Sequence, residues 1–179
     1  MATKPLANSL VTKMIDENGC LSLIYRRDRH LDRGGRRIYF YFRPHFAITM
    51  KEDKRDLLSQ IQQTLGCGKI TSSKGQVRLD VFSADEAKGI VSLLNKHSFA
   101  SPTRQREFDL WKEAVEIINR NHKKKVNAEK GKRGFISTWA TFNQGDLRRL
   151  FRIREEMKGY KKWRKSDYKW THSLLARFS

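Results

Sequence analysis

Apolar residues recur at helical spacing in several separate segments of the chain. The first segment, residues 6–15, predicts a helix that ends near Gly19. A second apolar stripe, over residues 57–65, stops at a glycine-rich sequence that suits a helix C-terminus. Ser83 and Glu86 have the spacing of a capping box at the start of a third helix. Two further helices are predicted, at residues 103–121 and 145–157.

Strand patterns lie between these helical segments. Residues 20–27 and 38–50 are rich in β-branched and aromatic side chains and predict two strands joined by a basic turn at residues 28–37. Pro44 is expected to interrupt the second strand, or to mark a bulge or an edge there. Two shorter strands are predicted at residues 69–72 and 76–82. The order α-β-β-α-β-β-α, with appended C-terminal helices, therefore predicts an α+β domain.

The balance of charged residues indicates the kind of partner that the protein binds. Lys and Arg number 38 against 19 Asp and Glu, which gives a formal net charge of +19. Such a surface attracts phosphate backbones through counterion release. Aromatic residues make up 11% of the chain, so it is not simply a disordered basic segment. These features favour a folded nucleic-acid-binding protein.

Cysteine usage and the N-terminus bear on the compartment. The two cysteines, Cys20 and Cys67, predict neither a disulfide framework nor a zinc site, so a reducing compartment fits. No long apolar run predicts a membrane span, and the N-terminus lacks the features of a signal or transit peptide. We expect a bacterial cytoplasm or, for an organelle-encoded protein, the organelle matrix or stroma, and no membrane partner.

Short motifs follow one another along the chain in a particular order, each at a boundary of a predicted helix or strand. Residues 11–19 (VTKMIDENG) lead into the first strand, and the segment 46–49 precedes the helix and glycine turn at 57–68. Residues from Thr103, and then from Gly145, begin the later helices. In this order the motifs resemble the LAGLIDADG homing endonucleases over roughly residues 6–160. We therefore expect a LAGLIDADG-like nucleic-acid-binding domain at residues 1–157 and a basic, aromatic tail at 158–179.

The resemblance implies an architecture and an assembly. Members of the family place a saddle formed by a four-stranded antiparallel sheet in the DNA major groove and pair two motif helices at a domain interface. With one motif, this chain would need to dimerise to build a complete saddle. However, Lys13 stands where the motif carries a small residue that lets the two helices approach. A homodimer is therefore doubtful.

The resemblance also assigns candidate catalytic positions. Asn18 stands where the family carries the acid that holds a divalent metal, and a neutral amide is a poor ligand for Mg²⁺. Asp16 and Glu17 are adjacent candidate metal ligands, with structural or solvated acids as the alternative interpretation. Lys54 and Arg104 are the candidates for the basic residues that organise water, with Lys51 and Arg106 as rivals, and a plain phosphate contact is the favoured alternative role for each of them. Mg²⁺ is expected only if the protein is catalytically active.

Basic residues outside this site are candidate nucleic-acid contacts. Those on the predicted strands and their turn are Arg26, Arg27, Arg33, Arg36, Arg37, Arg43, Lys51 and Arg78. A predicted basic loop at residues 122–134 adds Lys123, Lys124 and Lys125. The C-terminal tail, in which aromatic residues alternate with basic ones, adds Lys161, Lys162, Arg164 and Lys165.

Three functions fit these observations. The first is a nucleic-acid-binding protein with an impaired metal site, reused as an RNA-binding factor such as an intron maturase or a ribosome component. Asn18, Lys13 and the basic tail favour it, with structured RNA as the partner within a ribonucleoprotein and duplex DNA as the alternative. The second is an active Mg²⁺-dependent DNA homing endonuclease. The third is a sequence-specific DNA-binding protein that does not cleave.

Overall fold

The structure, a computed structural model, describes residues 5–32, 35–126 and 142–160, and only the backbone of residues 27–32, 35–40 and 122–126. The elements in chain order are α1 (Asn8–Asn18), β1 (Gly19–Asp32), β2 (Gly35–Lys51), a 3-10 turn (Glu52–Lys54), α2 (Arg55–Leu65), β3 (Lys69–Ser73), β4 (Gln76–Val81), α3 (Ala84–Leu94), α4 (Pro102–Val126) and α5 (Gln144–Lys158). The predicted α+β class and element order are confirmed.

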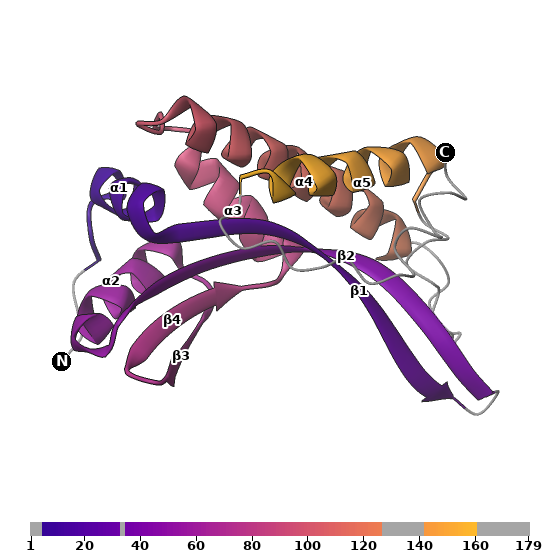
Figure 1. The fold of residues 1–179 in the computed structure, drawn as a ribbon, viewed down its shortest axis with the longest axis horizontal. Helices are drawn as coiled ribbons and strands as arrows, with labels where there is room; N and C mark the ends of the chain where they lie inside the picture. The colour runs from indigo at the N-terminus through magenta and orange to yellow at the C-terminus, as the bar shows by residue number, and fades with distance from the viewer. Residues whose placement is uncertain (1–4, 33–34, 127–141, 161–179) are drawn as a thin grey trace.

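The strands form one antiparallel sheet in the order β1-β2-β4-β3. The β1–β2 pairing runs without a break from Gly19 opposite Ile48 to Asp32 opposite Gly35. Within β2, only the last part, from Phe46 to Lys51, pairs with β4. The outer part of the β1–β2 hairpin is therefore a two-stranded ribbon that projects beyond the rest of the sheet (Figure 1).

The length of this ribbon corrects the predicted turn at residues 28–37. Strand β1 continues to Asp32 and β2 begins at Gly35, so most of the predicted turn is strand. The prediction was wrong because it required apolar residues, whereas an antiparallel ladder is closed by backbone hydrogen bonds and continues through polar residues. Strand β2 runs through Pro44 without a bulge, so the expected interruption and the expected bulge are both wrong. Pro44 lies just before the β4 partner begins at Phe46, so β2 is locally an edge there, as the remaining alternative predicts.

One face of the sheet is covered and the other is open. The helices lie on one side of the arched sheet, and the opposite side is concave (Figure 1). Strand alternation turns Leu21, Leu23 and Tyr25 into the core. They join a core built around the fully buried Trp111 and Phe46. The open face is left with the polar and basic residues of the same strands.

Helix ends follow local rules with two departures. Gly66 ends α2 in the left-handed region, at φ 67°. The Ser83 hydroxyl accepts from the Glu86 amide, but the Glu86 carboxylate accepts from the Gly68 amide, so half of the predicted capping box forms. Helix α4 extends to Val126, which places Lys123, Lys124 and Lys125 on a helix and corrects the first part of the predicted loop, because lysines are good helix formers. The rest of that predicted loop, residues 127–134, lies outside the described residues.

Candidate nucleic-acid interface

The open face of the sheet gathers predicted contacts from different strands. Arg26 lies opposite Tyr41, Arg43 opposite Ile24, and Arg78 opposite Thr49, so these arginines share one face. Lys51, at the end of β2, lies on the same face by alternation, and Arg26, Lys51 and Arg78 are exposed. Sequence reasoning missed Lys69, which stands opposite Asp80 and is also exposed; strand alternation was the signal that would have found it.

Other predicted contacts have less structural description. The backbones of Arg27, Arg36 and Arg37 lie in the projecting ribbon, and those of Lys123, Lys124 and Lys125 lie in the last turns of α4. Several others lie outside the described residues: Arg33, Lys161, Lys162, Arg164 and Lys165. For all of these the contact with nucleic acid stays a prediction.

A cavity of about 470 Å³ lies at the C-terminal end of α1, against the ends of β2 and β4. It brings together Asn18, Glu17, Lys51 and Lys54, which sequence reasoning had singled out. Three polar residues that it had not singled out also line the cavity: Thr49, Asp53 and Gln76. The Asn18 side-chain amide donates to the Met14 carbonyl at 3.4 Å. This cavity is the candidate catalytic site.

Arg104 and Asp16 do not line that cavity. The Arg104 guanidinium donates through Nη2 to the carbonyls of Ile15, at 2.9 Å, and Gly19, at 2.6 Å, and through Nη1 to Glu107. Asp16 accepts from the Ala100 amide at 3.0 Å. These contacts tie the end of α1 to the start of α4. The contacts that Arg104 makes in the structure hold these two elements together, and its catalytic role stays a prediction.

The donor set around the cavity fits Mg²⁺ poorly. Magnesium needs hard oxygen ligands in octahedral geometry, usually including carboxylates. Asp16 is engaged by the Ala100 amide, and Asn18 offers a neutral oxygen. Across the described part of the chain, no three His, Cys, Asp or Glu residues group as a metal site would require. At the position that the motif assigns to a metal-binding acid, the chain therefore offers a neutral oxygen, and the carboxylates that line the cavity are those of Glu17 and Asp53.

A buried polar network on the open face was not found by sequence reasoning. His45, only 7% exposed, lies between the Ser22 hydroxyl, 3.1 Å from Nδ1, and the Asp80 carboxylate, 2.7 Å from Nε2. Asp80 also accepts from Arg78 Nε at 2.8 Å. Their positions on one strand face were predictable from alternation, but the contacts span up to 35 residues of sequence.

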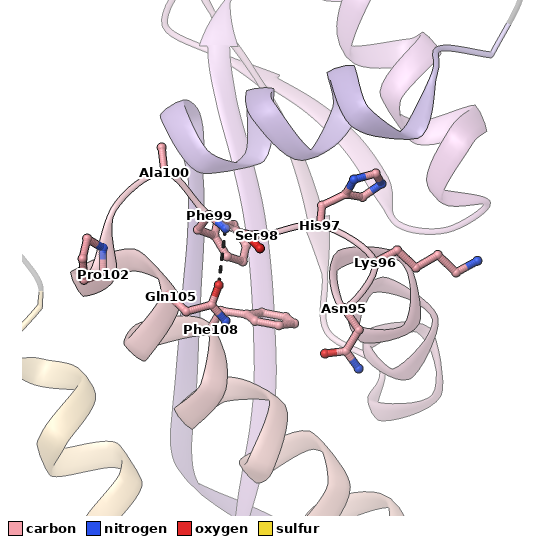
Figure 2. Close-up of a pocket in the computed structure, with 9 residues that line it drawn as sticks. All are labelled: Asn95, Lys96, His97, Ser98, Phe99, Ala100, Pro102, Gln105 and Phe108. Atoms are coloured by element: carbon pink, nitrogen blue, oxygen red, sulfur yellow. Dashed lines mark hydrogen bonds between the residues drawn. The ribbon is translucent and has the colours of Figure 1, made fainter.

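A second cavity, of about 510 Å³, lies at the connection between α3 and α4 (Figure 2). Gln105 bridges it by accepting from the Phe99 amide at 3.3 Å, and Lys96 and His97 line it. It belongs to the helical side of the molecule, so a ligand seated on the open sheet face would not reach it. No helix in the described residues is both long and apolar enough to cross a membrane.

Solved structures with this fold include several homing endonucleases. I-TnaI superposes with a TM-score of 0.68 at 15% identity, over 98% of this chain and 99% of its own. The archaeal intron-encoded I-Vdi141I, complexed with DNA, gives 0.65 at 18% identity over 96% and 95%. The meganuclease I-AabMI, bound to uncleaved DNA, gives 0.61 at 21% identity; the match covers 97% of this chain but only 49% of that one.

These likenesses establish the fold, and the sequence itself establishes the family. A search of curated proteins found no match. The sequence profile of the LAGLIDADG endonuclease family matches residues 14–115, which is more than half of the chain and includes the end of the motif helix, the whole sheet and the start of α4. The chain therefore belongs to the LAGLIDADG endonuclease family.

Proposed function

We propose that this chain binds duplex DNA with the open, concave face of its sheet. The observation that carries the proposal is the set of arginines and lysines from β1, β2, β3 and β4 on that face: Arg26, Arg43, Lys51, Lys69 and Arg78. Such side chains neutralise phosphates and pair with base edges. The similarly folded I-Vdi141I was solved in complex with DNA, which supports DNA as the partner.

The shape of the surface favours duplex DNA over duplex RNA. The major groove of B-form DNA is wide enough to admit a two-stranded ribbon, and it presents a distinct hydrogen-bond pattern for each base pair. The corresponding groove of A-form RNA is deep and narrow, and side chains do not reach its bases. The β1–β2 ribbon, which projects from the sheet as paired strands, has the form that fits the DNA groove (Figure 1).

We further propose that cleavage is impaired. Phosphodiester hydrolysis in this family would need divalent metal near the end of α1, where Asn18 supplies an amide in place of a carboxylate. Glu17 and Asp53 also line the cavity, but the neutral Asn18 and the engaged Asp16 weaken the ligand set. The protein would then act as a sequence-specific DNA-binding protein. An active Mg²⁺-dependent endonuclease is the rival.

Structured RNA is the second candidate partner. The same neutral Asn18 favours it, because a maturase or a ribosome component needs no cleavage site. The net charge of +19 attracts either DNA or RNA, because both are polyanions. For RNA the contact would involve exposed bases and backbone rather than a duplex groove.

One selection experiment separates these candidates. The full chain is offered a random duplex DNA library and a structured RNA library, with and without Mg²⁺. We expect one duplex sequence to be enriched and to remain uncut when Mg²⁺ is added. Enrichment of RNA alone would overturn the DNA proposal, and Mg²⁺-dependent cutting of the enriched duplex would overturn impaired cleavage.

A matched pair of variants then locates the interface. The double variant Arg26→Ala/Lys69→Ala removes two charges from the open face, and Lys88→Ala/Lys96→Ala removes two exposed charges from α3 and its C-terminal end. The open-face variant is expected to lose affinity and to flatten the salt dependence, since each phosphate contact contributes to that slope. Equal effects from both variants would contradict the open face as the binding surface.

A further inference from the structure

Arg78 forms an ion pair with Asp80, which lies two residues further along β4 on the same face of the sheet. Its Nε donates to Asp80 Oδ1 at 2.8 Å, while 45% of its side chain remains exposed on the open face. An arginine presents a planar fork with several donors, and a carboxylate bound to Nε does not itself occupy the edge formed by Nη1 and Nη2. On that edge, Nη2 of Arg78 lies 3.5 Å from His45 Nε2, a longer contact than the one to Asp80. That edge is the one that pairs with the O6 and N7 acceptors of guanine.

Asp80 is itself fixed by His45. Its Oδ1 lies 2.7 Å from His45 Nε2, and because an ionised carboxylate only accepts, Nε2 must carry the proton and donate. The opposite ring nitrogen, Nδ1, lies 3.1 Å from the Ser22 hydroxyl. Ser22 and His45 are opposite each other in the β1–β2 register, so the backbone ladder sets this contact. Ser22, His45 and Asp80 thus form a chain that ends on Arg78.

An aromatic ring packs against one side of this hydrogen-bonded series of side chains. Phe82 stacks on the His45 imidazole, with ring centroids 4.4 Å apart and planes 10° from parallel. The Arg43 guanidinium carbon lies 5.1 Å from the centre of the same Phe82 ring. His45 is therefore 7% exposed although it lies on the open face of the sheet. A buried, fully oriented imidazole cannot turn away from Asp80 without breaking both hydrogen bonds and the stack.

We propose that Arg78 is a specificity-determining residue that contacts a guanine in the major groove, and that Asp80, His45 and Ser22 are its positioning residues. The inference rests on the proposed DNA-binding function and deepens it. An arginine ordered before binding loses little freedom when it pairs with a base edge, so its hydrogen bonds discriminate between bases. Asp80 would also repel a phosphate that approached Arg78, which favours a base edge over the backbone.

Arg26 is the matched control. It lies on the same face and is exposed, and none of the side chains that the structure describes forms an ion pair with it; the side chain of Asp28, two residues along β1, is not among them. An unanchored arginine suits a phosphate contact, which positions the duplex without specifying its sequence. Its removal should weaken binding to all duplexes alike.

The test uses the full chain and the duplex enriched from the library, together with every single base-pair substitution of that duplex. Wild type should discriminate strongly at one or more G·C pairs. Arg78→Ala and Arg78→Lys should each lose roughly 5- to 150-fold of the preference at one G·C pair, the range for a bidentate arginine–guanine contact. Arg26→Ala should lower affinity for the whole panel without changing the preferences.

Asp80→Asn tests the positioning role through the same preference. It keeps the size of the side chain but removes the carboxylate, so discrimination at the pair assigned to Arg78 should fall while Arg78 is still present. Urea unfolding of each variant checks that the fold is retained. If Asp80→Asn does not fold, His45→Gln, which keeps an amide donor near Asp80, is measured in its place and should give a smaller loss at the same pair.

The outcomes separate this inference from the proposed function. If no duplex is enriched, the DNA-binding proposal fails. If a duplex is enriched but Arg78→Lys binds the panel like wild type, Arg78 contacts phosphate and the inference is overturned. If Arg78→Ala changes one pair and neither Asp80→Asn nor its substitute changes that pair, the guanine contact stands and the positioning role is overturned.

Discussion

At the scale of single residues, Gly19 shows why the motif ends in glycine. A Cβ atom placed there would lie 2.4 Å from the Ile15 carbonyl oxygen and 3.1 Å from Arg104 Nη2. The backbone is extended, with φ −78° and ψ 150°, so the requirement comes from space rather than from an unusual dihedral. The glycine lets the end of α1, the start of β1 and the Arg104 guanidinium meet.

Gly19→Ala is therefore expected to destabilise the protein by about 2 kcal/mol, because the added methyl group must displace the α1 end or Arg104. Urea unfolding at neutral pH measures the change. Gly89→Ala in α3 is the control: no atom lies within 4 Å of its Cβ position, so alanine should be neutral or stabilising by about 0.5–1 kcal/mol. Equal destabilisation by both substitutions would contradict the steric explanation.

Asn18 carries the second residue-scale prediction. Asn18→Asp adds a carboxylate to the cavity that already contains Glu17 and Asp53, and it should raise Mg²⁺ affinity measured by calorimetry. Asn95→Asp adds the same charge at the end of α3, at the other cavity, and should leave Mg²⁺ binding unchanged. The absence of any gain in the Asn18 variant would argue against the alignment of Asn18 with the family's metal-binding acid.

At the scale of elements, Arg104 joins α1 to α4. Its guanidinium donates to the Ile15 and Gly19 carbonyls at the C-terminal end of α1, and the Ile15 carbonyl also accepts from the Gly19 amide. Arg104→Ala should cost about 3 kcal/mol, since it also leaves Glu107 without this partner. Thermal unfolding of wild type and the Arg104→Ala variant measures this loss of stability. The exposed Lys54→Ala should leave the melting temperature nearly unchanged, and a large loss there would show that the loop after β2 is structural.

The pair Glu113–Arg149 joins α4 to α5 through two contacts of 2.6 Å. The hydrogen bond and charge of Arg149 lower the pKa of Glu113. A lowered pKa means that the pair stabilises the protein above the ordinary carboxylate range and that this stability is lost as pH falls through the folded-state pKa. Because 40% of the Glu113 side chain is exposed, solvent screening limits the contribution to about 0.5–1 kcal/mol.

Glu113→Gln tests this contribution. The difference in unfolding free energy between wild type and variant should be present at pH 7 and should shrink as pH is lowered from about 5 to about 3. Urea unfolding across this range gives the difference directly. A difference that stays constant with pH would show that packing, rather than the charge of Glu113, is responsible.

At the scale of the whole molecule, charge is divided between the folded domain and the C-terminal tail. Truncation after Tyr160 removes, among others, Lys161, Lys162, Arg164 and Lys165. The remaining chain keeps α5 up to Lys158 and the buried Met157, so it should unfold cooperatively. It should bind nucleic acid more weakly and with a shallower salt slope, because fewer phosphates are neutralised.

Anisotropy titrations at several salt concentrations measure that slope. Replacing all six basic residues of the removed segment by Gln in the full-length chain is the control, since it removes the same basic charge without removing the tail. They are Lys161, Lys162, Arg164, Lys165, Lys169 and Arg177. Matching slopes for the truncation and the replacement would assign the effect to charge. Loss of cooperative unfolding on truncation would instead make the tail part of the core.

Much of this protein was determined by its sequence alone. The positions of the helices and of the strand segments, and the glycine end of α2, follow from contacts between near neighbours along the chain. The grouping of Asn18 and Lys54 was also predicted, although through the family resemblance. Net charge is a property of composition, and it indicates a polyanionic partner without reference to the fold.

Only the tertiary structure decided which side chains meet. Arg104 binds a carbonyl 89 residues away and does not line the candidate catalytic cavity, and His45 joins Ser22 on one strand to Asp80 on another. The full length of the β1–β2 ribbon was likewise hidden, because backbone pairing continues where the apolar pattern stops. Periodicity reports which way a side chain faces; the partner it finds there depends on the packing of segments that are distant in sequence.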